Sequence, residues 1–471
     1  MKLILIFLSL LVVAGTITVV IKVSRHRSSS SNEFVRNAGW FLNNYEKRQQ
    51  VTVPANIDDE GIRKLVAKLL TPTRGDFAAE KLELLAEKAV PSLVEVLKDP
   101  RFWQKPKTAE PLYASAPVEA VLKLLQPFGP PAAIEPLSAM LKHPDKYFRQ
   151  QAALALANIA ENDCIEPMKL ALADSEDYVR AYAMMGIGWA FKYHRGSPEF
   201  LQATFDMLIP LLNKKDQSLS QAARTLLVIN REKGVPIILQ DRFFNLQNPI
   251  LVENLRALNE QDVVIPEEDL RRLMKPIEEN LEKYPNNSIF GECLIALART
   301  RSPTAEETIK KALDGANKQI AERAAEAMPV LKGVSKVTKR VFIRMDEVGF
   351  ENLNQPEKVV ASVEMMINEV NNGGFDQYFF NSSGDYAAQT LAGLKEIDAR
   401  DTEEILTKSM ALFGRKGPSS DRTVRIKQLE NFSKSSQAQL SDLDERFYKK
   451  PDNIEMKLYL YVAEHSDSFK D

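Results

Sequence analysis

Two neighbouring stretches of this chain repeat one pattern at a spacing of 31 residues. The first covers residues 134–152 and the second residues 165–183, and apolar residues recur at almost every equivalent position. Each stretch contains two short amphipathic runs, separated by a break at residues 143–145 or 173–175. We therefore expect each stretch to form a hairpin of two helices. A single hairpin cannot bury its apolar face, so neighbouring hairpins must stack into an array.

The repeat resembles HEAT and HEAT-like repeats, whose second helix opens with an Asp–apolar–Arg arrangement. That arrangement occurs here at residues 145–149 and again at 177–180. We expect the acidic residue near the break to cap the second helix and the arginine to pair along the stack. Weaker copies of the pattern cover residues 82–97, 205–223, 250–258, 277–297 and 309–324. The prediction is a HEAT-like α-solenoid of five to seven hairpins over residues 60–335.

An apolar run covers residues 3–23, and Lys22 is its only charge. About 20 apolar residues are enough for a helix to span a bilayer. We therefore predict a transmembrane anchor over residues 1–24 and a juxtamembrane linker over residues 25–59. A cleaved signal peptide is the alternative, although the apolar run continues past the small residues near Gly15 at which cleavage would occur.

More Lys and Arg follow the apolar run than precede it. Positively charged flanks favour the cytoplasmic side. The sequence therefore predicts a single-pass plasma-membrane protein whose bulk faces the cytoplasm, with the lipid bilayer as a partner through residues 3–23.

Acidic residues are concentrated in the last part of the chain. Residues 343–471 contain 23 Asp and Glu against 16 Lys and Arg, while the whole chain has a net charge of −2. Residues 60–342 carry only +2, which gives no sign of a basic nucleic-acid-binding surface on the solenoid. Apolar spacing predicts helices again, over residues 356–370, 385–397, 402–413 and 421–429. A final acidic segment covers residues 440–462. Asn371–Gly374 are expected to end the first of these helices as a helix C-cap.

Part of this last domain resembles a known family. The asparagine–glycine–aromatic run at residues 369–384 looks like the signature of the DNA-mimic protein C-terminal-type domain, and residues 443–448 are similar to its closing segment. The resemblance covers about residues 344–466 and implies a small all-α acidic domain, so the whole chain is expected to be all-α. The signature positions, expected to be structural, are Asn371, Asn372, Gly373, Gly374, Phe375, Tyr378, Phe379, Asn381 and Gly384.

The resemblance also implies a function. The characterised type is an acidic dimer whose carboxylates imitate the phosphates of duplex DNA and thereby occupy DNA-binding proteins. It implies for this chain a protein partner, of the DNA-binding kind, and a homodimer through the C-terminal domain. The carboxylates that could carry this imitation are Glu396, Asp398, Asp401, Glu403, Glu404, Asp442, Asp444 and Glu445, with Asp452 and Glu455 beside them. The alternative is that they are ordinary solvated helix faces.

No catalytic motif is evident in the sequence. It lacks a phosphate-binding loop, a zinc-protease helix motif and a serine-nucleophile elbow. Cys164 and Cys293 are expected at buried apolar positions of repeat helices. We therefore expect no cofactor, no metal site and no enzymatic activity.

The function that these features favour is a membrane-anchored, non-enzymatic scaffold whose acidic C-terminal domain binds a protein. No direct nucleic-acid binding is expected of it. The alternative is a nucleic-acid-binding HEAT-like solenoid tethered at the membrane, and an unrecognised enzyme is a third candidate.

Overall fold

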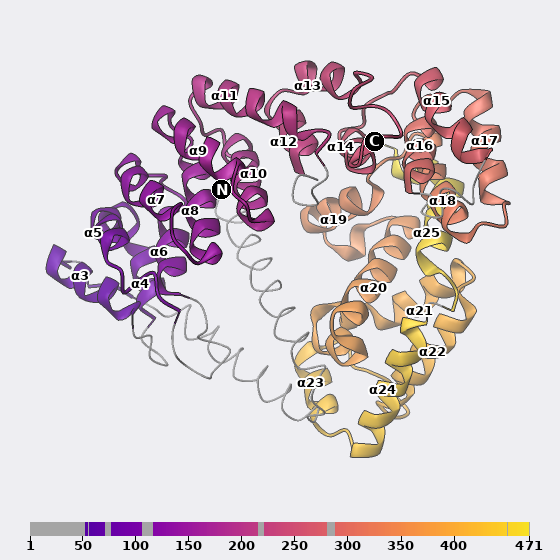
Figure 1. The fold of residues 1–471 in the computed structure, drawn as a ribbon. Helices are drawn as coiled ribbons and strands as arrows, with labels where there is room; N and C mark the ends of the chain where they lie inside the picture. The colour runs from indigo at the N-terminus through magenta and orange to yellow at the C-terminus, as the bar shows by residue number, and fades with distance from the viewer. Residues whose placement is uncertain are drawn as a thin grey trace. The chain divides into compact units, whose positions relative to one another are not determined.

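A computed structural model describes residues 52–54, 56–70, 77–105, 116–214, 221–279, 288–449 and 451–470. These described residues form helices joined by turns, and none of them lies in a strand (Figure 1). The chain divides into two compact units. We call the described part of residues 41–263 with 272–279 the repeat unit, and that of residues 264–271 with 280–471 the C-terminal unit.

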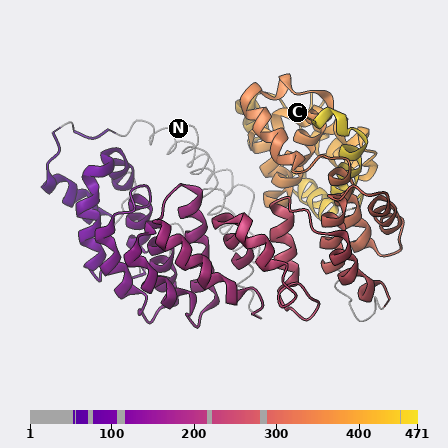
Figure 2. The same ribbon diagram turned by 90° about the horizontal axis from the view of Figure 1, so that it is seen from above.

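The repeat unit is a succession of short helices that follow one another in a row (Figures 1 and 2). Its α-helices are α3 (Asp59–Lys68), α4 (Ala78–Leu85), α5 (Val90–Glu95), α6 (Pro117–Leu125), α7 (Ile134–Met140), α8 (Lys146–Ile159), α9 (Ile165–Leu172), α10 (Asp177–Lys192), α11 (Pro198–Leu208), α12 (Ala222–Ile229), α13 (Arg231–Ile238) and α14 (Leu251–Glu260). Five 3-10 turns extend them: η1 (Ala86–Ala89), η2 (Val96–Lys98), η4 (Pro131–Ala133), η5 (Asn162–Cys164) and η6 (Ile209–Leu211). The next helix, α15 (Glu267–Glu278), has residues in both units.

The 31-residue repeat corresponds to two stacked hairpins, α7–α8 and α9–α10. The two second helices, α8 and α10, pack side by side. The buried positions of α8 recur 31 residues later in α10, and the pairs are Phe148 and Val179, Ala152 and Ala183, and Leu156 and Ile187. The predicted helical repeat is thus confirmed, because the periodic apolar residues form the contact between neighbouring hairpins.

Polar residues at the break link one hairpin to the next. The Asp145 carboxylate accepts a hydrogen bond from the Tyr147 N–H at 2.9 Å, so it caps α8 as expected. The Arg149 guanidinium donates to both carboxylate oxygens of Asp174 in the following hairpin, at 2.8 and 3.1 Å. Burial of Asp174 alone would raise its pKa, but the hydrogen bonds from Arg149 and from the Glu176 N–H outweigh burial and lower it. The predicted arginine pairing along the stack is therefore present at Arg149.

The C-terminal unit contains the last repeat helices and a compact helical domain. Its helices are α16 (Ser288–Ala298), α17 (Pro303–Leu313), α18 (Lys318–Leu331), α19 (Val337–Val348), α20 (Gln355–Phe380), α21 (Ala387–Glu396), α22 (Arg400–Ala411), α23 (Arg422–Glu430), α24 (Lys434–Tyr448) and α25 (Ile454–Glu464). Three 3-10 turns, η8 (Phe350–Asn352), η9 (Ser382–Tyr386) and η10 (Ser466–Phe469), complete it.

Helix α20 is the centre of this domain, because α19, α21, α23, α24 and α25 all pack on it. The last repeat helix, α18, packs on α25, and the Asn453 amide donates to the Glu322 carboxylate at 2.8 Å. The end of the repeat pattern and the C-terminal domain therefore share one compact unit. The domain boundary expected between residues 335 and 343 remains a prediction from the sequence pattern.

The first helix of this domain ends where the sequence predicts. Gly373 (φ −152°, ψ 20°) and Gly374 (φ 78°, ψ −175°) are not helical, and a second helical stretch follows them to Phe380. The two halves of α20 meet at this kink. The acidic segment at residues 440–462 contains most of α24 and α25.

The predicted anchor and linker, residues 1–24 and 25–59, fall almost wholly outside the described residues. Within the part of the chain that the structure describes, no helix has the length and apolar character needed to cross a membrane.

Candidate functional site

The candidate carboxylates are carried mainly by two helices of the C-terminal unit that pack together, α22 and α24. Arg446 of α24 reaches Glu404 of α22, with 3.4 Å between Nη2 and Oε1. Asp442 lies one helical turn before Arg446, so it shares the side of α24 that faces α22. The structure thus brings together carboxylates that are about 40 residues apart in sequence.

Four of the predicted residues are exposed on this helix pair. They are Asp401 and Glu404 on α22, and Asp442 and Glu445 on α24. We call these four residues the acidic patch. Glu403 lies beside them on α22 and is half-buried.

Two other predicted residues, Glu396 and Asp398, are exposed but are engaged within the chain. The Glu396 carboxylate accepts hydrogen bonds from the Tyr461 hydroxyl at 2.6 Å and from the Gln355 amide at 3.1 Å. Asp398 pairs with Arg400 at 2.7 Å and lies 3.9 Å from the Lys457 ammonium. These two carboxylates therefore offer a partner less free negative charge than the sequence suggests.

Asp444 and Asp452 have structural positions. The Asp444 carboxylate accepts a hydrogen bond from the Phe375 N–H at 2.7 Å, so it caps the half of α20 that follows the kink. The Asp452 carboxylate accepts one from the Thr402 N–H at 2.6 Å, in the first turn of α22. Negative charge at a helix N-terminus is favourable, because unpaired N–H groups point toward it. Their carboxylates are used in holding the fold together.

The patch carboxylate at Glu404 is kept ionised by its neighbours. A hydrogen bond from Lys408 is the main cause that lowers its pKa, and Arg446 adds to the effect. The pKa of Asp398 is lowered in the same way, chiefly by its hydrogen bond with Arg400. Both groups therefore carry their full charge at neutral pH.

The helix pair carries much less charge than DNA. Helix α22 has 12 residues, of which three are acidic and two basic. It is about 18 Å long, a length over which duplex DNA carries about 10 charges. Helix α24 likewise has three acidic and two basic residues. The patch therefore fits a small cluster of cations on a partner better than a surface that covers several turns of DNA.

The aromatic residues of the 369–384 run form the core of the domain. Phe375, Tyr378 and Phe379 are fully buried, as expected for structural positions. The kink at Gly373 and Gly374 turns them toward the closing segment, where the rings of Phe375 and Phe447 are 5.9 Å apart.

The closing segment holds the kinked helix at several points. Besides the Asp444 cap, the Tyr448 hydroxyl donates to the Val370 carbonyl at 2.9 Å. The two motifs that carry the family resemblance are far apart in sequence but lie together in the fold. This contact gives a physical reason why they occur in one domain.

The polar residues of the run surround Glu369. Its carboxylate accepts hydrogen bonds from Gln377 at 2.6 Å, Asn381 at 2.9 Å and Ser383 at 3.1 Å. This arrangement ties the two halves of α20 to the turn η9. Of the remaining signature positions, Gly374 and Gly384 are buried, Asn372 and Gly373 are half-buried, and Asn371 is exposed.

Arg425 is a key residue of this domain that the sequence pattern does not single out. Its side chain is fully buried. Its guanidinium donates to the carbonyls of Phe379 at 2.6 Å and Asn381 at 2.8 Å, to the carbonyl of Ser419 and to the carboxylate of Asp385. Its only sequence signal is an arginine within an otherwise amphipathic run, which is too common to single it out.

The described residues contain no cluster of three or more His, Cys, Asp or Glu placed to hold a metal ion. Cys164 and Cys293 are both buried, as expected. Burial raises the pKa of the Cys164 thiol to about 11 and raises that of Cys293 further. Neither thiol is therefore an activated nucleophile.

These features define a class of protein: an all-helical repeat protein that carries a small helical domain with an acidic face. Comparison with known families makes the assignment more specific. Residues 351–465 match the family described as DMP19-like protein, and residues 115–188 match that of HEAT repeats. Both expected resemblances are thereby confirmed.

Comparisons with whole proteins add little. No curated protein matches the chain in sequence. A solved structure that resembles it is the crystal structure of an engineered protein, which is 18% identical. That match covers 59% of this chain and 98% of the engineered one, with a TM-score of 0.23.

Proposed function

We propose that this protein is a non-enzymatic scaffold whose C-terminal domain binds the basic surface of a DNA-binding protein. The observation that carries the proposal is the match of residues 351–465 to the DMP19-like family. HEAT repeats at residues 115–188 support the scaffold role, because stacked repeats offer an extended surface for partners. The acidic patch supplies a surface of suitable charge on α22 and α24.

The charges around the patch define how binding would work. A cation of the partner would compete with Lys408 and Arg446 for the Glu404 carboxylate. Charge complementarity of this kind raises the association rate and selects basic partners, but it contributes less to affinity. We therefore expect binding that weakens as salt is raised, and shape contacts that supply the rest of the affinity.

The test is a capture experiment with the full chain. The chain is immobilised, offered a lysate at low salt, and washed with or without duplex DNA. A patch variant combines Asp401→Asn, Glu404→Gln, Asp442→Asn and Glu445→Gln. A control variant removes the same number of charges from exposed positions of the repeat unit through Glu83→Gln, Glu161→Gln, Glu199→Gln and Glu232→Gln.

We expect the wild type and the control to retain DNA-binding proteins that duplex DNA displaces, and the patch variant to retain far less of them. Retention by the patch variant equal to that of the control would contradict the role of the patch. A retained set that DNA does not displace would contradict the imitation of DNA.

We also propose that residues 3–23 anchor the protein in the plasma membrane with its bulk in the cytoplasm. The length and apolar character of the run support this. The mass of the N-terminal peptide after extraction from membranes distinguishes an anchor from a cleaved signal peptide. Recovery of a chain that begins after residue 16 would contradict the anchor.

A homodimer through the C-terminal domain is proposed on the family resemblance alone. Sedimentation velocity of the full chain tests it, and a monomer at micromolar concentration would contradict it.

A further inference from the structure

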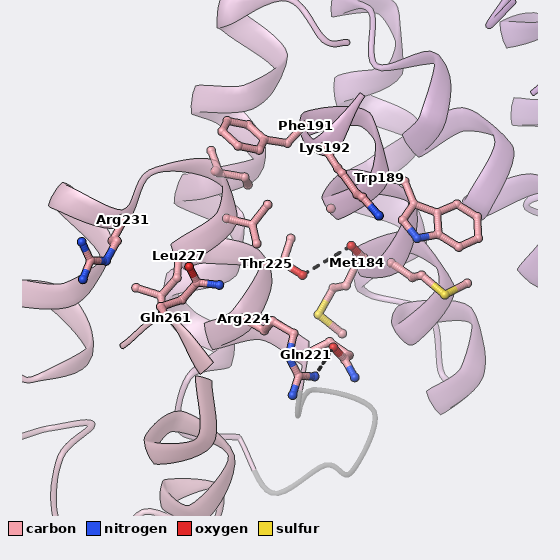
Figure 3. A pocket seen from close by; sticks show the side chains of 14 residues that line it. Met184, Trp189, Phe191, Lys192, Gln221, Arg224, Thr225, Leu227, Arg231 and Gln261 are labelled. Atoms are coloured by element: carbon pink, nitrogen blue, oxygen red, sulfur yellow. Dashed lines mark hydrogen bonds between the residues drawn. The ribbon is translucent and has the colours of Figure 1, made fainter. Parts of the chain in front are cut away.

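A hollow of about 600 Å³ lies in the repeat unit between α10 and α12, the second helices of neighbouring hairpins. Its size is within the range of known ligand sites, about 300–1,000 Å³. Most of its lining is apolar, and the main apolar side chains are those of Met184, Met185, Trp189, Phe191 and Leu227 (Figure 3). The hollow lies within one unit and is separate from the acidic patch.

Three cations surround these apolar side chains. Lys192 and Arg231 are exposed, and Arg224 is half-buried beside Gln221 (Figure 3). Arg224 bonds to the Glu260 carboxylate and donates to the Gln221 amide oxygen at 2.7 Å. Among the described residues, those that line the hollow include no carboxylate. An occupant that places an acidic group beside an apolar one would therefore match both features.

Gly188 leaves part of this space open. It lies in the middle of α10, where glycine destabilises a helix by about 1 kcal/mol relative to alanine. A Cβ atom at this position would meet no atom within 4 Å, so no neighbouring group requires a glycine there. Gly188 also lines the hollow. A side chain at this position would project into the space instead of improving the packing of the unit.

We propose that the hollow between α10 and α12 binds a peptide segment that carries an apolar side chain flanked by acidic residues. The apolar side chain would lie against Trp189 and Met185, which are both half-buried, and methionine adapts to varied shapes. Its acidic neighbours would pair with Lys192 and Arg231. A peptide is favoured over single-stranded nucleic acid, because methionine and aliphatic groups outnumber the flat aromatic faces on which bases stack.

The proposal does not depend on the acidic patch or on its partner. It gives the repeat unit a binding site of its own. The protein would then join two partners, one on each unit.

The test begins with a random peptide library of about 12 residues, displayed on phage and selected on the full chain. Selected peptides are synthesised with a fluorophore, and their binding is measured by polarisation at about 50 and about 200 mM salt. We expect sequences with a large apolar residue next to Asp or Glu, and binding that weakens at the higher salt.

Two variants then locate the binding. Gly188→Leu fills the hollow without removing any contact of the fold, and should weaken peptide binding at least about tenfold. Lys192→Glu with Arg231→Glu changes only exposed cations, and should weaken binding by a similar factor at low salt. The matched controls are Leu170→Ala, an exposed apolar residue on α9, and Lys142→Glu, an exposed cation of the same unit. Circular dichroism checks that every variant is folded.

Failure to select any peptide would overturn the proposal. Selected peptides without acidic residues would also overturn it. So would peptides that bind Gly188→Leu and Lys192→Glu with Arg231→Glu as tightly as they bind the two control variants. Binding of a uridine oligonucleotide that Gly188→Leu abolishes would overturn it in favour of a nucleic-acid site.

Discussion

Replacing Gly374 by alanine should destabilise the C-terminal domain. Gly374 has φ 78° and ψ −175°, a backbone region that is essentially restricted to glycine. An added Cβ would lie 2.4 Å from an Asp444 carboxylate oxygen. That carboxylate cannot simply move away, because it accepts the Phe375 N–H at 2.7 Å.

The magnitude follows from two terms. Backbone strain at such a position costs about 2 kcal/mol. Displacement of Asp444 removes a helix cap worth about 1 kcal/mol. We therefore expect Gly374→Ala to cost about 3 kcal/mol, and Asp444→Ala alone to cost about 1 kcal/mol.

The double variant should cost about 3 kcal/mol as well, because the cap is already lost in Gly374→Ala and alanine at residue 444 leaves room for the new methyl group. The double variant would thus lose about 1 kcal/mol less stability than the sum of the losses of the two single variants. This coupling is the distinctive result, since strain alone predicts simple additivity.

Hydrogen exchange, followed by mass spectrometry on peptides that cover α20, measures the effect within the full chain. A cost of about 3 kcal/mol corresponds to protection that falls by about two powers of ten. Gly349→Ala is the matched control, because Gly349 has φ 81° and ψ 152° but an added Cβ would meet no atom within 4 Å. It should show strain without coupling to Asp444.

A cost below about 1 kcal/mol for Gly374→Ala would refute the strain argument. Additive costs would refute the contact with Asp444. An Asp444→Ala variant with unchanged hydrogen exchange but weaker partner binding would support the partner-binding role that the sequence predicted for Asp444.

Three further predictions concern the two units. Arg425→Met leaves three carbonyls and the Asp385 carboxylate without their buried donor, and should cost about 3–5 kcal/mol in urea unfolding, whereas Arg415→Ala at an exposed position should change stability by less than about 0.5 kcal/mol. The pKa of Asp174 is lower in the folded chain than its ordinary value. The stabilisation that this carboxylate gives to the folded chain is therefore complete at neutral pH and is lost as pH falls below about 4. Asp174→Asn should flatten the acid side of the stability profile in that window. Glu267 accepts hydrogen bonds from Ser302 and Thr304 that lower its pKa to about 2, so Glu267→Gln should remove up to about 3 kcal/mol of stability at neutral pH and very little at pH 2.

Each of these has a result that would contradict it. Arg425→Met with near wild-type stability would mean that its neighbours find other donors. Identical acid profiles for the wild type and Asp174→Asn would mean that the carboxylate forms an equivalent pair in the unfolded chain. A Glu267→Gln variant that loses as much stability at pH 2 as at neutral pH would show that its carboxylate acts through packing and not through charge.

The two units carry two surfaces of opposite character. The hollow between α10 and α12 is apolar with cations around it, while the acidic patch on α22 and α24 is polar and negatively charged. A partner suited to one surface is therefore poorly suited to the other. This difference favours two partners over one, and it allows each surface to be removed by mutation without affecting the other.

Much of the fold could be predicted from periodicity. Apolar spacing gave the helices of the repeat and the 31-residue step, because a helix that buries one face must repeat its apolar residues every three to four positions. The asparagine–glycine–aromatic run was distinctive enough to indicate the family and to place Phe375, Tyr378 and Phe379 in the core. Charge counting correctly located the acidity in the last domain.

The site was less predictable, because charge in a sequence does not reveal which carboxylates are already paired. Asp442 and Asp444 differ by two positions on one helix, yet one is exposed and the other caps α20. Side chains two positions apart in a helix are separated by about 200° around the helix axis, so they lie on nearly opposite sides. Only the packing of α24 decides which of the two sides faces inward.

The sequence by itself determined that this chain is helical, that its middle repeats, and that its acidic end resembles a DNA-mimic domain, since these properties depend on local periodicity, composition and a contiguous motif. Only the tertiary structure decided that Asp444 caps the helical half that follows Gly374, that Arg425 is buried among carbonyls, and that Gly188 opens into a hollow between two hairpins. Each of these depends on groups that are distant in sequence and meet only when the helices pack.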